Sequence, residues 1–317
     1  MVYDMNTERT GMFDFSGKAD IERLDHLIHK NDFNHLILSG SMLFDSPLSL
    51  KKPVTLTGQG CIIKTSGNDH AVTLESDGCA VENITFFGTG KNSGSDISGI
   101  HVKETLENSI INCTFSSFSG AGIRLSRAVG SHQGNHITGC WFKDSNVGIE
   151  VLERAEYTLI TGCTFFRNQK ALYISGGNTN MSACVISDNA VGIHIDSGDN
   201  HAHGVLGGCS LNHNDIPLFV TDVNYGYNIT GCLFYCGDIR ISSSRHIKLS
   251  SCDFSGIDFH ITNSDNCIIM NSHMIEKTDE AGAAVNSNRF LCDRSVLKIA
   301  GCFDSPLISD TGGCLVL

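Results

Sequence analysis

The sequence predicts an all-β fold: a right-handed parallel β-helix, a solenoid of roughly ten coils with an N-terminal capping helix. First, the chain of 317 residues contains Gly 33, above the usual share of about 7%, which points to many turns, and only Pro 4, which argues against a disordered chain. Second, a cysteine recurs in near-identical settings, among them TGCWF, TGCTF and TGCLF, at gaps of 20 to 27 residues. Third, a G-I-x-V motif such as Gly148-Ile149-Glu150-Val151 recurs at a similar interval.

Each repeat holds two short strands in which apolar residues alternate with other residues, separated by turns rich in Ser, Asn, Asp and Gly. A four-stranded propeller blade needs about 40 residues, nearly twice this period. There is also little room for a helix between the strands, which excludes βαβ units and leucine-rich repeats. Stacked coils lie about 4.8 Å apart, so they superpose equivalent residues into ladders of Cys, of Ile/Val and of Asn/Ser/Gly. The crossover rule favours the right-handed form.

The repeated cysteines are predicted to be small, reduced core residues. Side chains that project in parallel from neighbouring coils do not have the approach and torsion that a disulfide requires. No matched CxxC pairs appear, so no zinc site is indicated. The repeated positions are Cys113, Cys140, Cys163, Cys184, Cys209, Cys232 and Cys252.

Along the chain, three segments are expected: 1–50 with the capping helix and first strands, 51–275 with the coils, and 276–317 as a C-terminal cap or subunit contact. The helix is predicted between Ser16 and Lys30, because apolar residues fall on one face there. A solenoid must cover its open end, and this helix is suited to that. Val296–Ile299 and Leu315–Leu317 are candidates for final strands or for a subunit contact. The apolar residues of the helix are Ile21, Leu24, Leu27 and Ile28.

Charge and hydropathy exclude several functions. Lys+Arg 22 against Asp+Glu 34 gives a net charge of −12, which argues against nucleic-acid binding. No run of 18 apolar residues occurs, so membrane insertion is not expected, and the acidic start has no signal-peptide pattern. No metal and no cofactor are predicted.

The outward residues of the G-I-x-V strands form a predicted column on the solvent face. Its middle is aromatic and ionisable, which suits a sugar, because rings stack on apolar sugar faces while charged groups hold hydroxyls and carboxylates. Arg124 and Arg240 have the bidentate geometry to clamp an acidic sugar. The predicted substrate-binding residues are Arg124, Tyr173, His194, Phe219 and Arg240. The whole column is Thr73, His101, Arg124, Glu150, Tyr173, His194, Phe219, Arg240 and His260.

Carboxylates concentrate beside this column, and glycoside hydrolysis needs one carboxyl as acid and another as base or nucleophile. The candidate catalytic residues are Glu150, Glu153, Asp196 and Asp199. We expect Glu150 to act as acid and Asp196 as base, with Asp199 as an alternative to Asp196. The Glu150 and His194 rungs are two coils, or about 10 Å, apart. Alternatively, Arg124, Tyr173 and His194 would suit a polysaccharide lyase, in which a cation stabilises the enolate.

The segments Leu36–Gly40, Pro47–Leu50 and Val54–Gly60, which follow the helix and lead into the coils, carry a resemblance. In this succession the chain resembles the pectate-lyase-like β-helix superfamily, particularly bacteriophage tailspikes and capsule depolymerases. The resemblance implies binding, and often cleavage, of a bacterial surface polysaccharide, commonly as a homotrimer.

The galacturonase succession of NTD, DD, GHG and RIK and the DPH motif of alginate epimerases are absent, so the resemblance implies a substrate class rather than a mechanism. We therefore expect a tailspike-like host-recognition protein that binds and hydrolyses capsule or O-antigen. The alternatives are a non-catalytic receptor-binding spike and a lyase. The resemblance places the chain in the phage tail of the virion after synthesis in the host cytoplasm, either as a fragment or attached through a partner.

Overall fold

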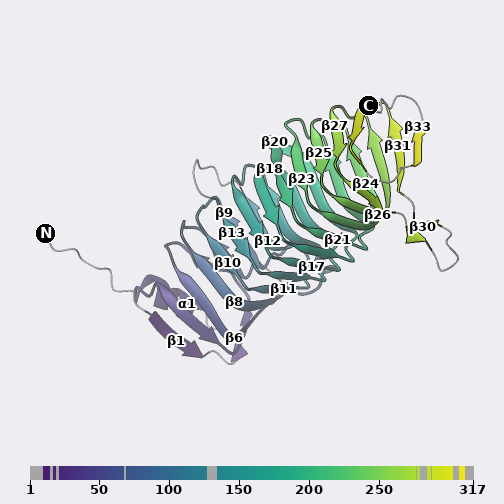
Figure 1. Ribbon diagram of the computed structural model, residues 1–317. Helices are drawn as coiled ribbons and strands as arrows, with labels where there is room; N and C mark the ends of the chain where they lie inside the picture. Colours follow the sequence, from purple (N-terminus) through teal and green to yellow (C-terminus); the bar gives the residue numbers. More distant parts are fainter. Residues whose placement is uncertain are drawn as a thin grey trace.

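The computed structural model describes residues 10–14, 17–18, 21–67, 69–126, 134–275, 277–278, 284–286, 288–302 and 307–310. The chain winds into a right-handed parallel β-helix of about 10 turns, nearly all of it strand, and this confirms the predicted fold class. Figure 1 shows the coils stacked in sequence order from the purple N-terminal end to the yellow C-terminal end.

The strands form three ladders, here called faces A, B and C, and some strands bend from one face into the next. Face A comprises β5 (Leu48–Leu50), β7 (Val72–Leu74), β9 (Ile100–Lys103), β12 (Ala121–Ser126), β15 (Val147–Leu152), β22 (Ile216–Thr221), β31 (Arg289–Asp293), β33 (Leu307–Asp310) and the first parts of β18 (Lys170–Ser182) and β20 (Val191–Gly207). The last parts of β24 (Leu233–Ser242) and β26 (Asp253–Thr262) complete it.

Faces B and C follow face A in each coil. Face B comprises β1 (Thr10–Asp14), β3 (His35–Ser39), β10 (Ser109–Ile111), β13 (His136–Thr138), β16 (Thr158–Thr161), β23 (Tyr227–Thr230), β25 (Ile247–Ser250), β27 (Cys267–Met270), β32 (Leu297–Ala300), the first parts of β6 (Thr55–Thr65) and β8 (Ala80–Phe87), and the last parts of β18 and β20. Face C comprises β2 (Gly17–Lys18), β4 (Ser41–Phe44), β11 (Thr114–Ser116), β14 (Trp141–Lys143), β17 (Thr164–Phe166), β19 (Val185–Ser187), β21 (Ser210–Asn212), β28 (His273–Ile275) and the remaining parts of β6, β8, β24 and β26.

The predicted helix is present as α1 (Ile21–His29), at the N-terminal end of the solenoid (Figure 1). Leu24 and Ile28 are fully buried, so its apolar face packs on the core. At the other end β32 confirms a strand at the predicted position, whereas β29 (Lys277–Thr278) and β30 (Ala284–Asn286) form an antiparallel pair outside the coils. The predicted strand or contact at Leu315–Leu317 lies outside the described residues.

The corner between faces B and C explains the recurring T-G-C sequence. The residue before each cysteine has a left-handed backbone, with φ of 64° at Gly139, 63° at Gly162 and 53° at Ala183. Glycine adopts this conformation without steric cost, which accounts for its frequency at this position. The turn then directs the cysteine side chain into the core.

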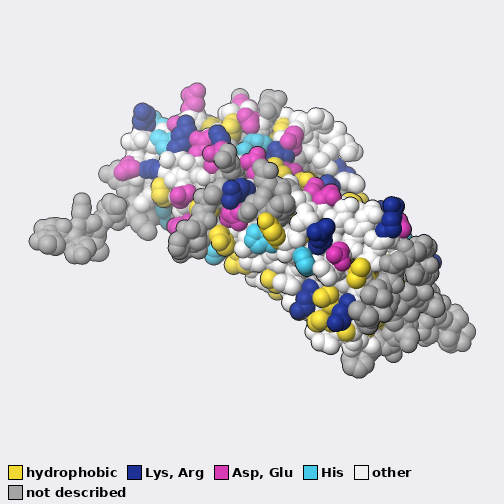
Figure 2. Space-filling model, turned by 90° about the horizontal axis from the view of Figure 1, so that it is seen from above, with side chains coloured by type: hydrophobic (Ala, Val, Ile, Leu, Met, Phe, Trp, Pro, Cys, Tyr) yellow, Lys and Arg dark blue, Asp and Glu magenta, His cyan; other side chains and the backbone are white. Residues whose placement is uncertain are grey.

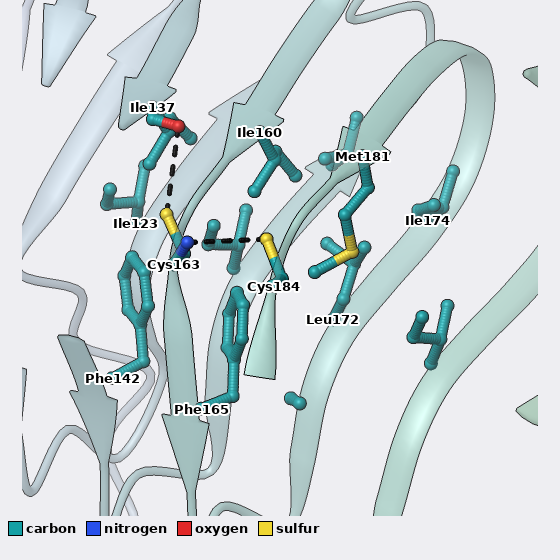
Figure 3. Packing of buried hydrophobic residues seen from close by; sticks show 14 of the residues in the cluster. Ile123, Ile137, Phe142, Ile160, Cys163, Phe165, Leu172, Ile174, Met181 and Cys184 are labelled. Atoms are coloured by element: carbon teal, nitrogen blue, oxygen red, sulfur yellow. Dashed lines mark hydrogen bonds between the residues drawn. The ribbon is translucent and has the colours of Figure 1, made fainter. Parts of the chain in front are cut away.

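The interior consists of ladders of identical residues, as the repeat predicts. The rings of Phe142 and Phe165 stack with centroids 4.9 Å apart, and Cys163 lies beside Cys184 (Figure 3). The thiol of Cys163 donates to the carbonyl of Ile137 in the preceding coil, at 3.7 Å. Its hydrogen bond with Cys140 and then burial raise the pKa of Cys163 to about 12, so the thiol stays protonated. None of the thirteen cysteines among the described residues forms a disulfide.

Buried asparagines form a second ladder where face C turns into face A. Asn168 donates from Nδ2 to Oδ1 of Asn189 at 3.0 Å, and Asn189 donates likewise to Asn214 at 2.9 Å. Each Oδ1 also accepts from a backbone N–H of the preceding coil. Since buried polar groups are costly without partners, these side chains fix the spacing of the turns that lead into face A.

Close packing at the glycine of the G-I-x-V motif leads to a stability prediction. A Cβ at Gly148 would lie 2.4 Å from the carbonyl oxygen of Ala171 and 2.7 Å from a ring carbon of Phe165. We therefore expect Gly148→Ala to lower the free energy of unfolding by about 1–3 kcal/mol, as overpacking does. The control is Gly207→Ala, whose Cβ would meet only a methyl of Thr230 at 3.9 Å and should cost less than about 0.5 kcal/mol. Equal losses in urea unfolding would contradict the packing argument.

Candidate functional site

A continuous column of outward side chains runs along face A, one from each successive coil, in the predicted register. Arg124 pairs with Glu150 and Glu150 with Tyr173 on neighbouring strands. The column continues from Tyr173 through His194 to Phe219. The residues on either side of each member point into the core, because side chains alternate along a strand. The remaining members are Thr73, His101, Arg240 and His260. Thr73 is in the predicted register but is buried rather than on the solvent face, at 6% exposure.

The centre of the column is aromatic. The His194 ring lies 5.1 Å from that of Tyr173 and 4.6 Å from that of Phe219, at an interplanar angle of 17° to the latter. Val191 and Ile216, half-buried, lie beside this stretch on the same strands. The three rings therefore form a surface spanning two rung spacings, roughly 10 Å, to which the apolar faces of sugar rings can stack.

Arg124 lies between two carboxylates. Its Nε donates to Oε2 of Glu150 at 2.6 Å and its Nη2 donates to Oδ1 of Asp96 at 2.6 Å. Arg124 and Glu150 are mostly buried, with side chains 15% and 14% exposed, whereas Asp96 is 69% exposed. The hydrogen bond from Arg124 lowers the pKa of Asp96. Asp96 comes from the loop before β9 and does not belong to the repeated motifs.

Two histidines from the preceding part of the chain lie next to Arg124 on face A. His70 and His101 contact edge to face with centroids 4.9 Å apart, and Nε2 of His101 lies 3.0 Å from Oγ of Ser126. Burial first, and then the charges of His70 and Arg124, lower the pKa of His101 to about 4. His101 is therefore neutral at pH 7.

Tyr173 links the column to Asp196. Its hydroxyl donates to Oδ2 of Asp196 at 3.3 Å, and Nζ of Lys170 lies 4.4 Å from the ring centroid. Burial raises the pKa of Tyr173, and Asp196 adds to this while Ser175 opposes it. Tyr173 is therefore a proton donor near neutral pH rather than a base.

His194 is held as a neutral ring. Its Nδ1 is buried without a hydrogen-bond partner among the described residues, and Nε2 lies 3.5 Å from Oγ1 of Thr221. Burial and then the charge of Lys170 lower the pKa of His194 to about 4, against the opposing charge of Asp196.

Asp196 lies farther from Glu150 than the rung spacing alone predicts. Glu150 pairs with Tyr173, but Asp196 pairs with Ser175, two residues farther along the strand. Two rungs of about 4.8 Å and two residues of about 3.3 Å place the two Cα atoms roughly 12 Å apart. The distance of about 10 Å derived from the sequence was that between the Glu150 and His194 rungs, and it did not include this offset along the strand. Tyr173 lies on the rung between the two carboxylates.

The other predicted carboxylates are distributed over the turns between faces A and B. Glu153 is exposed, with a left-handed backbone at φ 53°. The side chain of Asp199 lies outside the described residues, although its backbone pairs with Gly176. Two tyrosines in these turns, Tyr157 at 42% and Tyr225 at 68% exposure, were not predicted as site residues.

The C-terminal end of the column is a lattice of ion pairs. Arg240 donates to Asp238 at 2.8 Å, and Arg289 donates to both carboxylate oxygens of Asp258. His260 lies 3.8 Å from Asp238. The ligand atoms of Asp238, Asp258 and His260 lie within 4.8 Å of one another, as in a metal site. Guanidinium groups already satisfy both carboxylates, so these contacts account for the cluster without an ion.

A stability prediction follows from the two neutral histidines. Because the pKa values of His101 and His194 fall from 6.5 in the unfolded chain to about 4 in the folded one, protonation favours unfolding. The two neutral histidines therefore contribute fully to the free energy of unfolding above about pH 6.5. This contribution should be lost as the pH falls from 6.5 towards 4. Urea unfolding at pH 7.5 and pH 5 checks this, and His194→Gln should show a smaller difference between the two pH values than the wild type. If His194→Gln and the wild type lost the same stability between pH 7.5 and pH 5, the lowered pKa of His194 would be contradicted.

The fold and this surface define an elongated parallel β-helix protein with its candidate site on one flank. A family model described as the right-handed β-helix region matches residues 17–182 and 91–231, and the chain belongs to that family. No curated protein matches the sequence.

Solved structures with the same fold share little sequence with it. The catalytic unit of a thermostable GH87 α-1,3-glucanase from Streptomyces thermodiastaticus superposes with a TM-score of 0.64 at 12% identity, over 95% of this chain and 66% of that one. The Azotobacter vinelandii mannuronan C-5 epimerase AlgE4 A-module gives 0.52 at 14% identity, over 95% and 94% of the two chains. A tailspike protein mutant of the E. coli bacteriophage HK620, in complex with a pentasaccharide, gives 0.53 at 10% identity, over 93% and 60%. At such identities the likeness shows the fold alone.

Among the described residues, no helix has the length and apolar composition needed to cross a membrane.

Proposed function

We propose that the protein binds a bacterial surface polysaccharide along face A and hydrolyses it. The observation that carries this proposal is the aromatic stretch of Tyr173, His194 and Phe219, which has carboxylates beside it on the same outward surface. A row of rings along a straight strand ladder matches an extended chain of sugars better than a compact metabolite. The likeness to a glucanase and to a tailspike bound to a pentasaccharide supports this class of ligand.

Glu150 and Asp196 are the proposed catalytic carboxylates. One oxygen of Glu150 accepts from Arg124, which has donors only, so Glu150 suits the base better than the acid expected from the sequence. Asp196 then supplies the proton. In the reaction, water attacks the anomeric carbon and gives a proton to Glu150, the glycosidic C–O bond breaks, and the leaving oxygen takes the proton of Asp196. With the two Cα atoms roughly 12 Å apart, the side chains can hold the carboxyl groups about 6.5–9.5 Å apart, the separation that leaves room for a water in an inverting mechanism.

The test is incubation of the protein with capsule or O-antigen, followed by assays of reducing ends and of absorbance from unsaturated sugars. Reducing ends without absorbance support hydrolysis. Both signals together would show a lyase and would replace the proposed mechanism. Binding with neither signal would show a non-catalytic receptor-binding spike, a second candidate favoured by the hydrogen bonds that tie Arg124 to both Glu150 and Asp96.

The proposal includes a place in the phage tail as a host-recognition protein, made in the host cytoplasm and carried on the virion, alone or through an attachment partner. It is supported by the likeness to a tailspike. Mass spectrometry of purified virions carrying this gene product would test it, and absence of the chain from them would contradict it.

A homotrimer is the proposed assembly. Trp141, Val185 and Leu233 are exposed in one column of face C, and Leu159 and Val205 in one column of face B. These uncharged positions suit contact between copies of a chain with a net charge of −12. Light scattering should give three times the 34.2 kDa of one chain, and Trp141→Lys with Leu233→Lys should give monomers. A monomeric wild type at micromolar concentration would contradict the trimer.

A further inference from the structure

The cations of face A are all engaged by neighbouring groups. Arg124 donates to Glu150 and Asp96, Arg240 donates to Asp238, and Arg289 donates to Asp258. Lys170 lies over the ring of Tyr173, whose hydroxyl contacts Asp196. Lys103 lies 3.5 Å from Glu75. On the described part of face A, five cationic side chains thus lie among six carboxylates, so this surface has no positive charge in excess.

The same balance extends over the surroundings. Figure 2 shows basic, acidic and histidine side chains intermixed over much of the visible side. His101 and His194 add no charge at neutral pH, because burial lowers the pKa of each to about 4. The net charge of the whole chain is −12. A polyanion would therefore meet no excess of positive charge on face A.

The central stretch is also built for apolar contact. His194 presents its ring between those of Tyr173 and Phe219, and Val191 and Ile216 flank it. Among the described residues, the cation at this stretch is Lys170, whose ammonium lies over the Tyr173 ring. The Tyr173 hydroxyl in turn contacts Asp196, so the charges of Lys170 and Asp196 offset each other there. Separating the mostly buried Arg124 from Glu150 would leave a charge without compensation, which is costly.

From these contacts we infer that the polysaccharide bound on face A is uncharged along the aromatic stretch: a neutral glycan, not one built from uronic, sialic or sulfated sugars. This inference rests on the proposed function and specifies the substrate class of the same site. It also bears on mechanism. β-Elimination requires a carboxylate on the sugar next to the scissile bond, so a neutral glycan leaves hydrolysis as the cleavage reaction. The bidentate clamp on an acidic sugar, expected of Arg124 and Arg240 from the sequence, is then not used.

The experiment uses polysaccharides extracted from bacterial surfaces and separated by anion exchange into an uncharged and an anionic fraction. Affinity electrophoresis of the whole protein measures retention by each fraction, at about 0.05 and 0.5 M NaCl. We expect the uncharged fraction to bind, with less than a twofold change between the two salt concentrations, because no ion pair forms. Phe219→Ala should weaken that binding about tenfold or more, whereas Phe166→Ala, an aromatic control on face C, should not.

A variant with one charge removed provides an independent test. Asp96→Asn removes one carboxylate from Arg124, so retention by the anionic fraction at low salt should rise about fivefold or more. Tighter, salt-sensitive binding of the anionic fraction by the wild type, lost in Arg124→Ala, would overturn this inference and leave the proposed function standing. Equal retention by both fractions would also overturn it. Binding to neither fraction would contradict the proposed function, and the inference with it.

Discussion

Glu150→Gln and Asp196→Asn are each expected to lower the turnover of the polysaccharide by about 10²-fold or more, the scale of general acid–base catalysis. Glutamine can still accept from Arg124 at the position of Oε2, and asparagine can still accept from the Tyr173 hydroxyl. Neither amide can take up or supply a proton. Reducing-end release per mole of protein measures the loss.

Two controls separate catalysis from folding and binding. The free energy of unfolding should change by about 1 kcal/mol at most in Asp196→Asn, which keeps size and hydrogen bonding. Glu150→Gln should cost about 1–3 kcal/mol, because it removes the charge that faces the mostly buried Arg124 and leaves Asp96 as its remaining carboxylate. Binding should persist, since the rings of His194 and Phe219 are untouched. Asp199 is close enough in the chain to replace Asp196, so the double aspartate variant is needed. Full activity in Glu150→Gln and in the double variant would show that these carboxylates are not catalytic.

The largest effect on stability is expected at Phe142. Its ring is 1% exposed and stacks between those of Phe115 and Phe165, at centroid distances of 5.1 and 4.9 Å. It also closes the space over Gly122, where an added Cβ would lie 2.7 Å from the ring. Phe142→Ala should therefore lower the free energy of unfolding by about 3–5 kcal/mol, as for other buried aromatic residues.

Phe166→Ala provides the matched control. Phe166 is on the next coil of the same face but points outward, where the guanidinium of Arg167 lies 4.3 Å from its ring centroid. Its loss should cost about 1 kcal/mol or less. Urea unfolding of both variants measures the difference. A loss below 1 kcal/mol in Phe142→Ala would show that neighbouring rings close the gap.

Much of the fold was predictable because each coil repeats the same short sequence motifs. The alternation in Gly148-Ile149-Glu150-Val151 determines which side chains point out, and the repeat of this motif determines which strands pair. The register of the column follows from these two facts alone. The corner glycines and the cysteines that follow them could be placed in the same way.

The partners of the column were not predictable, since they come from segments that do not repeat. Asp96 lies in a loop between β8 and β9 that is longer than the turns at the same corner in the next coils, so the sequence does not indicate that it reaches Arg124. The offset of Asp196 could have been derived, because it follows His194 by two residues on the same strand.

The contribution of one residue per coil to the column also has an evolutionary consequence. Each coil forms its hydrogen bonds only with the coil before and the coil after it, as β15 does with β12 and β18. An in-frame duplication or deletion of a whole coil would therefore lengthen or shorten the outward column of face A by one step of about 4.8 Å and keep the remaining contacts. Changes in coil number are thus a direct genetic route by which a lineage of such proteins could alter the length of the column that each copy presents.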